Sequence, residues 1–415
     1  MIQENGQVSL YYLLATEVKM DNNQESILAK HYGNEATISC YDKCVVKTYK
    51  HRYFRYNRIY NRKGEAFFLE KYKSPYFASL LGVSPNAIIL PNYGEIIAVS
   101  RKNMKLKQLG LDYLELTRWI SGLRAELSRL QLLHRDISPK NILYDKRSNK
   151  YVLIDFSWAI AKSDLEKEGK QPEILNHTYA KSDDEAFDKI SIEAVQTLLS
   201  KIGAEKHYDG SNLKVGWVYH PIPFPEFSVP VHKTAAVSEY EEVLKYCEIN
   251  NHSSLNILEI GSSIGYFSFK LAQLGNTMTA VEADPDVWAA AEAIRTFKNF
   301  ENVKFINARL NSEILSGLGN NFDLTIMLNV HMWIHKQLGS EHTAALMKQL
   351  SKKTKRLIFQ TAGAKSKGMY RVSELTDNET IKIYLEHCGF SNVVHLRDTR
   401  RHGGTRALFT ANGNI

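Results

Sequence analysis

The sequence has no apolar stretch that could cross a membrane as a helix. Its longest run without a charged side chain extends from Ser74 to Gly94 and is interrupted by three prolines, which excludes a continuous spanning helix. The first residues, which include Glu4 and Gln7, lack the basic-then-apolar order of a signal peptide. We therefore expect a cytoplasmic protein, with a peripheral position at an inner membrane as the alternative.

Cysteine is also scarce. The 415 residues include only Cys40, Cys44, Cys247 and Cys388. The first two are close in the sequence, but no second pair is present to complete a zinc site. We predict that all four are reduced thiols.

The composition is that of an ordinary globular protein. Hydrophobic residues make up 44% of the chain and charged residues 24%, which is enough for two cores and shows no bias towards disorder. The net charge of +8 indicates an acidic partner, such as a phosphorylated glycan, a nucleic acid or an anionic membrane surface. Charge alone does not choose among these partners.

Two short motifs carry the chemistry of the first half. Residues 134–141 read HRDISPKN and residues 154–157 read IDFS, and together they resemble the catalytic loop and the metal-binding motif of protein kinases. The resemblance implies an α+β protein-kinase-like fold that binds ATP. It also implies that Asp136 orients the acceptor hydroxyl, while Asn141 and Asp155 hold Mg²⁺ against the phosphates.

The resemblance assigns further residues to the nucleotide site. Lys47 lies near the end of a β-rich run, where kinases place the lysine that contacts the α and β phosphates. Glu65, at the start of an expected helix, is its predicted ion-pair partner, with Glu70 as the alternative. Asp183 resembles the aspartate that braces the catalytic-loop backbone.

The loop that covers the phosphates in kinases is poor in glycine here. The segment from Lys30 to Ala36 contains only Gly33, which we assign to nucleotide binding. This shortage leaves open a first domain that is a pseudokinase binding module. Only about fifty residues follow Asp155 in this domain, too few for a peptide-docking platform, so we predict a glycan or another hydroxyl-bearing acceptor rather than a protein.

A second signature begins near residue 255. Residues 255–266 read as an apolar strand, a small-residue turn and the start of a helix, a geometry that brings backbone close to a cofactor. The acid Glu259 before Gly261 is typical of class I methyltransferases, which use S-adenosylmethionine. Gly265 ends the turn, and Ser263 replaces the middle glycine of the pattern.

Three more strands follow this turn. Glu282 ends the next strand, where it is placed to accept hydrogen bonds from the ribose hydroxyls. Asn307 follows at the expected adenine edge, and Asn329 ends the fourth strand and is assigned to the cofactor site. The alternation of strands and helices predicts an α/β doubly wound, Rossmann-like sheet.

The segment after the fourth strand is the expected acceptor site. Trp333 and His335 resemble the same region of methyltransferases that methylate a terminal phosphate on RNA, and we assign both to catalysis. A phosphate oxygen is already anionic, so its methylation needs alignment and cationic groups rather than a base. The cationic candidates are His331, His335, Lys336, Arg371, Arg397, Arg400, Arg401 and Arg406.

Three segments make up the predicted organisation: a kinase-like domain at 1–205, a connector at 206–234 and a methyltransferase domain at 235–415. The connector is rich in proline and aromatic residues. We expect Trp217, Tyr219 and His220 to pack onto the second domain.

Together the two halves resemble the bifunctional kinase and methyltransferase that terminates bacterial O-antigen polysaccharides of lipopolysaccharide. The resemblance implies that the terminal sugar is phosphorylated with ATP and that this phosphate is then methylated with S-adenosylmethionine. The domain order is reversed here, and no heptad pattern follows the methyltransferase. The alternative is an RNA-phosphate-directed methyltransferase with a pseudokinase module. The oligomeric state is not predicted.

Overall fold

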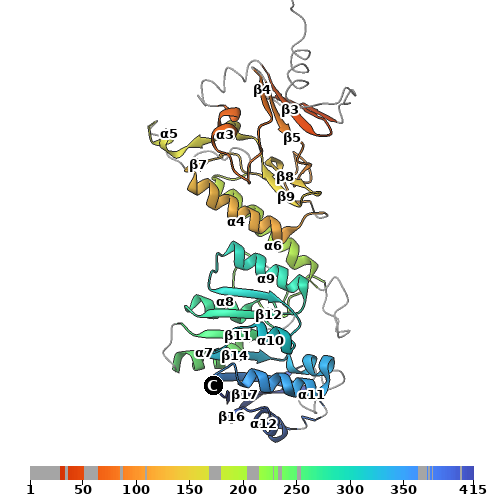
Figure 1. Ribbon diagram of the computed structural model, residues 1–415, viewed down its shortest axis with the longest axis vertical. Helices are drawn as coiled ribbons and strands as arrows, with labels where there is room; N and C mark the ends of the chain where they lie inside the picture. Colours follow the sequence, from red (N-terminus) through yellow and green to blue (C-terminus); the bar gives the residue numbers. More distant parts are fainter. Residues whose placement is uncertain are drawn as a thin grey trace, which may run out of the picture. The chain divides into compact units, whose positions relative to one another are not determined.

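The computed structural model contains two compact units that divide between Glu193 and Ala194, within helix α6 (Figure 1). The residues it describes are 29–32, 36–50, 64–84, 87–107, 110–167, 179–202, 215–227, 229–231, 236–249, 254–362, 372, 374–375, 377–401 and 404–415. No helix in these ranges is both long enough and apolar enough to cross a membrane.

A five-stranded antiparallel sheet opens the first unit, with the strand order β1-β2-β3-β5-β4. β-Branched and apolar residues favour strands here, and Val46 packs on one face with Cys44 and Ile89. Lys47 follows Val46 and therefore points to the other face. The elements are β1 (Ala29–Tyr32), β2 (Ala36–Cys40), β3 (Cys44–Tyr49), α3 (Glu65–Lys71), β4 (Gly82–Ser84) and β5 (Ala87–Pro91).

The rest of the first unit is built around helix α4 (Tyr113–Arg129). Asp112 caps this helix by accepting a hydrogen bond from the Glu115 amide. Apolar side chains of α4, which include Leu116 and Leu123, are buried. The other elements are β6 (Glu95–Ile96), β7 (Leu132–Leu133), η1 (Pro139–Asn141), β8 (Ile142–Asp145), β9 (Lys150–Leu153), η2 (Phe156–Trp158), β10 (Ile160–Ala161), α5 (Lys162–Lys167) and α6 (Asp183–Lys201). This unit is therefore α+β.

The second unit contains a seven-stranded mixed sheet with the order β13-β12-β11-β14-β15-β17-β16. The first five strands in this order are parallel, and β17 is antiparallel to both of its neighbours, β15 and β16. The strands are β11 (Asn256–Ile260), β12 (Thr277–Glu282), β13 (Val303–Asn307), β14 (Leu324–Leu328), β15 (Arg356–Ala362), β16 (Ser391–Arg401) and β17 (Gly404–Asn412). The predicted alternation is confirmed up to β15. The antiparallel end was not predicted.

Helices cover both faces of this sheet (Figure 1). One large apolar cluster joins the sheet to α10, α11 and α12, and includes Phe359, Phe409 and Leu346. Helices α7, α8 and α9 lie on the opposite face. The bounds are α7 (Ala236–Ile249), α8 (Tyr266–Gln273), α9 (Pro285–Phe297), α10 (Ser312–Gly317), α11 (His331–Ser351) and α12 (Asn378–His387). The result is a Rossmann-like three-layer domain.

The aromatic connector packs within the second unit. The ring of His220 lies 5.8 Å from that of Phe267, and Phe224 lies 5.3 Å from Phe269. The expected packing of His220 on the methyltransferase half is thus confirmed. These contacts cover α8, the helix that begins directly after the glycine turn.

Candidate functional site

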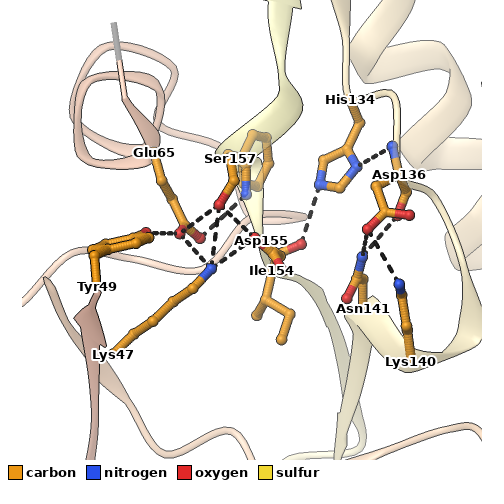
Figure 2. A network of polar contacts seen from close by, with 11 residues as sticks. Lys47, Tyr49, Glu65, His134, Asp136, Lys140, Asn141, Ile154, Asp155 and Ser157 are labelled. Carbon is orange, nitrogen blue, oxygen red and sulfur yellow. Dashed lines mark hydrogen bonds and ion pairs between the residues drawn. The ribbon is translucent and has the colours of Figure 1, made fainter. Parts of the chain in front are cut away.

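The first unit brings together three of the predicted nucleotide-site residues. Lys47 on β3 donates hydrogen bonds to Glu65 Oε2 at 2.8 Å and to Asp155 Oδ1 at 2.7 Å. Glu65 is the first residue of α3, and Asp155 follows β9 with a φ of 66°. Figure 2 shows the lysine amine between the two carboxylates. The alternative partner, Glu70, is exposed.

Burial and charge set the ionisation of this cluster. Burial alone would lower the pKa of Lys47, but Asp155 and Glu65 raise it well above its usual value. Burial would likewise raise the pKa of Asp155, but the Lys47 charge and its hydrogen bond hold that pKa well below the usual range. The lysine is therefore charged and the aspartate ionised across the physiological range.

The predicted catalytic loop forms a second group beside the first. Asn141 Nδ2 donates to Asp136 Oδ2 and to the Asp136 carbonyl, both at 2.8 Å. The Ile154 amide donates to the Asn141 carbonyl at 3.0 Å, which ties this loop to the residue before Asp155. Lys140 Nζ lies 3.5 Å from Asp136 Oδ2. The Asp136 carboxylate is thus held in one orientation.

Asp183 supports the loop from the start of α6, as the sequence predicted. Its carboxylate accepts the backbone N–H groups of His134 at 2.8 Å and Arg135 at 2.9 Å. Arg135 has a positive φ of 69°, a conformation that is uncommon outside glycine and needs such support. The His134 side chain packs inward and contacts the Ile154 carbonyl through Nε2 at 3.1 Å.

Sequence reasoning missed two members of the network. Ser157 Oγ donates to Asp155 Oδ1 at 2.7 Å and lies 3.3 Å from Lys47 Nζ. The Tyr49 hydroxyl donates to Glu65. Strand alternation could have found Tyr49, because it lies two residues after Lys47 and shares its face. No local pattern singles out Ser157, which is buried.

The residues present fit a nucleotide bound through magnesium. Both recorded hydrogen bonds of the Asn141 side chain use its nitrogen, which leaves the amide oxygen for a cation beside the Asp155 carboxylate. No group of three or more His, Cys, Asp or Glu in the described ranges could hold a metal ion. Mg²⁺ is commonly held by one or two protein oxygens together with substrate phosphates and water. Gly33 lies outside the described residues, and all these roles stay predictions.

In the second unit the glycine turn follows β11. Gly261 has a φ of 74°, and a Cβ there would lie 2.2 Å from Val330 Cγ2. Gly265 has a φ of 84°, and a Cβ there would lie 2.7 Å from Phe305. Only glycine fits both positions. The turn therefore offers bare backbone at the carboxyl edge, which suits the close approach of a nucleoside cofactor.

Glu282 is fixed at the same edge by backbone donors. Its carboxylate accepts the Ser263 N–H at 2.7 Å and the Asp284 N–H at 2.9 Å. Burial raises its pKa, and these hydrogen bonds oppose that rise. Asn307 is exposed next to it and donates to the Glu282 carbonyl at 3.1 Å. The three predicted cofactor residues are thus adjacent.

Glu259 is buried beneath the turn. Its carboxyl group accepts a hydrogen bond from the Ser268 hydroxyl of α8. Burial raises the pKa of Glu259 to about 8, with a smaller contribution from the charge of Glu282. In this structure Glu259 therefore ties β11 to α8, and its predicted contact with the cofactor stays a prediction.

Asn329 belongs to a chain of amides that the sequence did not reveal. Glu239 on α7 accepts a hydrogen bond from Gln360 Nε2 at 3.2 Å, and Gln360 Oε1 accepts one from Asn329 Nδ2. A carboxylate only accepts hydrogen bonds, so Glu239 fixes the orientation of Gln360, which fixes that of Asn329. Asn329 Oδ1 is left buried without a partner.

The predicted acceptor residues lie at the start of α11. Trp333 packs against the apolar cluster, and Lys336 Nζ lies 5.8 Å from the centre of its ring. His335 Nε2 lies 3.2 Å from Ser340 Oγ and 3.4 Å from Glu374 Oε2. Both side chains remain partly exposed.

His331 was wrongly expected to supply positive charge. It is buried, with Nε2 2.9 Å from the Tyr384 hydroxyl. Burial, followed by the charge of His335, lowers the pKa of His331 to about 3. A neutral imidazole cannot hold an anion by charge. Among the other cationic candidates, Arg371 lies outside the described residues.

Comparisons with known proteins agree with the second unit. A family model described as a methyltransferase domain matches residues 251–394. No curated protein matches the chain. The solved structure of WbdD, a bifunctional kinase-methyltransferase, is 20% identical, with a TM-score of 0.42 over 52% of this chain and 46% of that chain. The chain thus spans less than half of WbdD.

A second solved structure is that of magnesium protoporphyrin IX methyltransferase from Synechocystis PCC 6803 with bound SAM. It is 18% identical, with a TM-score of 0.34 over 43% of this chain and 79% of that chain. Similarities this distant assign no activity. The family match, the strand order around β11 and the glycine turn agree with one another. Residues 251–394 are therefore a class I, S-adenosylmethionine-dependent methyltransferase domain.

Proposed function

We propose that the chain is a bifunctional transferase. The first unit, with a kinase-like fold, transfers the γ-phosphoryl group of ATP to a hydroxyl group, and the methyltransferase domain then methylates the product on its phosphate. The acceptor is a glycan, such as the end of an O-antigen-type polysaccharide, or a related metabolite. The supporting observation is the position of Lys47 between Glu65 and Asp155, next to the Asp136–Asn141 pair.

The chemistry of the first step follows from these contacts. Asp136 is oriented by Asn141 and can accept the proton of an acceptor hydroxyl. Asp155 and the Asn141 amide oxygen would hold Mg²⁺, which neutralises the phosphates when it is bound. Lys47 would contact the phosphates while Glu65 keeps it in place. Catalysis would depend mainly on positioning and electrostatics.

The second step makes smaller demands on the protein. A phosphate monoester is already anionic at neutral pH, so no base has to remove a proton before the methyl group is transferred. Trp333 and His335 would line the acceptor side, and Glu282, Asn307 and the Gly261 turn would hold the cofactor. The lowered pKa of His331 makes its imidazole a poor base, which is consistent with a step that needs none.

The test is sequential incubation of candidate glycans with the protein, ATP and magnesium, and then with S-adenosylmethionine, followed by mass spectrometry. We expect a phosphate increment first and a methyl increment second. Asp136→Asn should abolish the first increment. Asp145→Asn is the matched control, because that partly exposed strand-end aspartate lies outside the cluster. Methylation of an unphosphorylated acceptor at an equal rate without ATP would refute the proposed order of the two steps.

The net charge is compatible with more than one class of partner. The net charge of +8 suits a phosphorylated glycan at an anionic membrane surface, with the protein in the cytoplasm. RNA is the second candidate acceptor, combined with a pseudokinase first unit. A steep fall of RNA affinity with salt concentration would favour it, and failure of the protein to bind ATP and magnesium would favour the pseudokinase.

A further inference from the structure

Arg397 on β16 carries two donor atoms that nothing satisfies. Its Nε and Nη2 atoms are shielded from water and have no hydrogen-bond partner, although the residue as a whole is only half-buried. No other side chain in the described part of the chain has two such nitrogens. A guanidinium is always charged and can only donate, so burying it without acceptors is costly. These two nitrogens therefore need hydrogen-bond acceptors, which oxygen atoms can supply.

A β-bulge determines where this side chain points. His395 is opposite Phe409, whereas Arg397 is opposite Leu408. Two steps along β16 therefore match one step along β17, with Leu396 as the extra residue. The bulge turns Arg397 onto the face that Leu408 occupies. In a regular strand Arg397 would share the face of His395 and the apolar cluster.

The residues opposite Arg397 on the neighbouring strands lead across the sheet towards Asn329, at the edge where the cofactor is expected to bind. Leu408 is opposite Gln360 on β15, and Gln360 is hydrogen-bonded to Asn329. Neighbouring strands are about 4.8 Å apart, so the Cα atoms of Arg397 and Gln360 are separated by about 10 Å. Arg406 is buried on the same face, opposite Ala362 at the carboxyl end of β15. Arg397 and Arg406 therefore lie on the face of the sheet that carries Gln360.

The two unsatisfied atoms form the edge of the guanidinium that binds carboxylates elsewhere in this chain. Arg295 holds Glu292 through Nε at 2.7 Å and Nη2 at 2.8 Å. Arg129 holds Glu126 through the same two atoms, both at 2.8 Å. This edge matches two oxygens of one carboxylate or phosphate group.

We propose that Arg397 binds an oxyanion through Nε and Nη2. The neighbouring carboxylate of Asp398 does not fill this place, because it contacts His395 Nε2 at 2.9 Å. Two sources offer the required pair of oxygens: the phosphate of the acceptor and the carboxylate of S-adenosylmethionine. The first source rests on the proposed function, and the second rests only on the methyltransferase domain.

The test is titration calorimetry of the full chain with inorganic phosphate and, separately, with S-adenosylhomocysteine and its decarboxylated analogue. Arg397→Gln should weaken binding of the oxyanion at least about tenfold, because a charge-assisted bidentate contact is lost. The oxyanion affinity of Arg397→Lys should lie between those of the wild type and Arg397→Gln, because lysine keeps the charge but cannot make the two-nitrogen contact. If Arg397→Gln does not fold, Arg397→Lys replaces it in the test. Arg356→Gln is the control, because Arg356 begins β15 at the opposite end of the strand.

Each result has a definite meaning. Weaker phosphate binding with unchanged S-adenosylhomocysteine binding supports the site and assigns it to the acceptor. Weaker binding of S-adenosylhomocysteine but not of its decarboxylated analogue supports the site and assigns it to the cofactor. Unchanged affinity for all three ligands in a folded variant overturns the proposal. Phosphate binding requires no ATP turnover, so an inactive first unit would leave these results unaffected.

Discussion

At the scale of single residues, motif spacing identified side chains that meet in space, but it did not identify their surroundings. Lys47, Glu65 and Asp155 were predicted and are in contact. The neutral state of His331 was missed, because it depends on burial by β15 and α12. Ser157 was missed because its contact with Lys47 joins positions that are 110 residues apart in the sequence. Ionisation and hydrogen bonding are properties of the packed state.

Glu259 gives a prediction about pH at this scale. Its pKa is raised by burial to about 8, whereas an unfolded glutamate titrates near pH 4.3. The folded state therefore binds the proton more tightly, so the free energy of unfolding should fall as the pH rises from about 4.5 to about 8. The slope contributed by this group is at most ~1.4 kcal/mol per pH unit.

The measurement is denaturant unfolding of the methyltransferase unit between about pH 5 and about pH 8. In Glu259→Gln the stability should fall less steeply with pH, because the buried amide does not titrate. The control is Glu313→Gln, which changes an exposed glutamate of α10. Identical slopes in the wild type and Glu259→Gln would contradict the assigned protonation.

At the scale of elements, apolar runs and small-residue turns located β11, β12, β13 and β14 close to their observed bounds. The central strands β11 and β14 are buried between helix layers, so their sequences are mostly apolar. The hairpin of β16 and β17 was missed. Strand β16 lies at the edge of the sheet, reads SNVVHLRDTRR and carries a bulge, so it lacks the regular alternation that marks a strand.

The glycine turn after β11 gives a prediction about this element. Gly261→Ala places a Cβ 2.2 Å from Val330 at a φ of 74°, so both a clash and backbone strain oppose it. We expect the affinity for S-adenosylhomocysteine in calorimetry to fall at least about tenfold, because a strained left-handed residue alone costs about 1–2 kcal/mol.

Adding Val330→Ala removes the clash but not the strain, so the double variant should recover part of the affinity. Gly317→Ala is the control, since a Cβ at Gly317 meets open space and the backbone there is ordinary. Full affinity in Gly261→Ala would show that the turn does not shape the cofactor site.

At the scale of the whole molecule, each candidate site is made from one unit alone. The Lys47, Asp136 and Asp155 cluster lies before the division at Glu193, and the residues around Gly261 and Glu282 lie after it. The sequence predicts two domains because each half carries its own signature, and the predicted bounds stay a prediction. The sequence could not identify the acceptor, because acceptor contacts depend on loops and surface charge.

If the chain has the two proposed activities, this separation predicts that they complement each other between molecules. Asp136→Asn alone should leave the acceptor unmodified, and Gly261→Ala alone should produce the phosphorylated but unmethylated acceptor. An equimolar mixture of the two variants should produce acceptor that carries both groups, as detected by mass spectrometry. If wild-type protein makes the doubly modified product and the mixture makes none, the intermediate does not leave the chain that formed it.

The amide chain that ends at Asn329 has one more consequence. An asparagine can present a donor or an acceptor, and at Asn329 the choice is made by Glu239 through Gln360. Glu239 lies before the region that matches the methyltransferase family, and Arg397 lies after it. Proteins that share the matched region can therefore differ in the hydrogen-bond polarity of this asparagine and in the charge that β16 contributes, because both are set by residues outside that region.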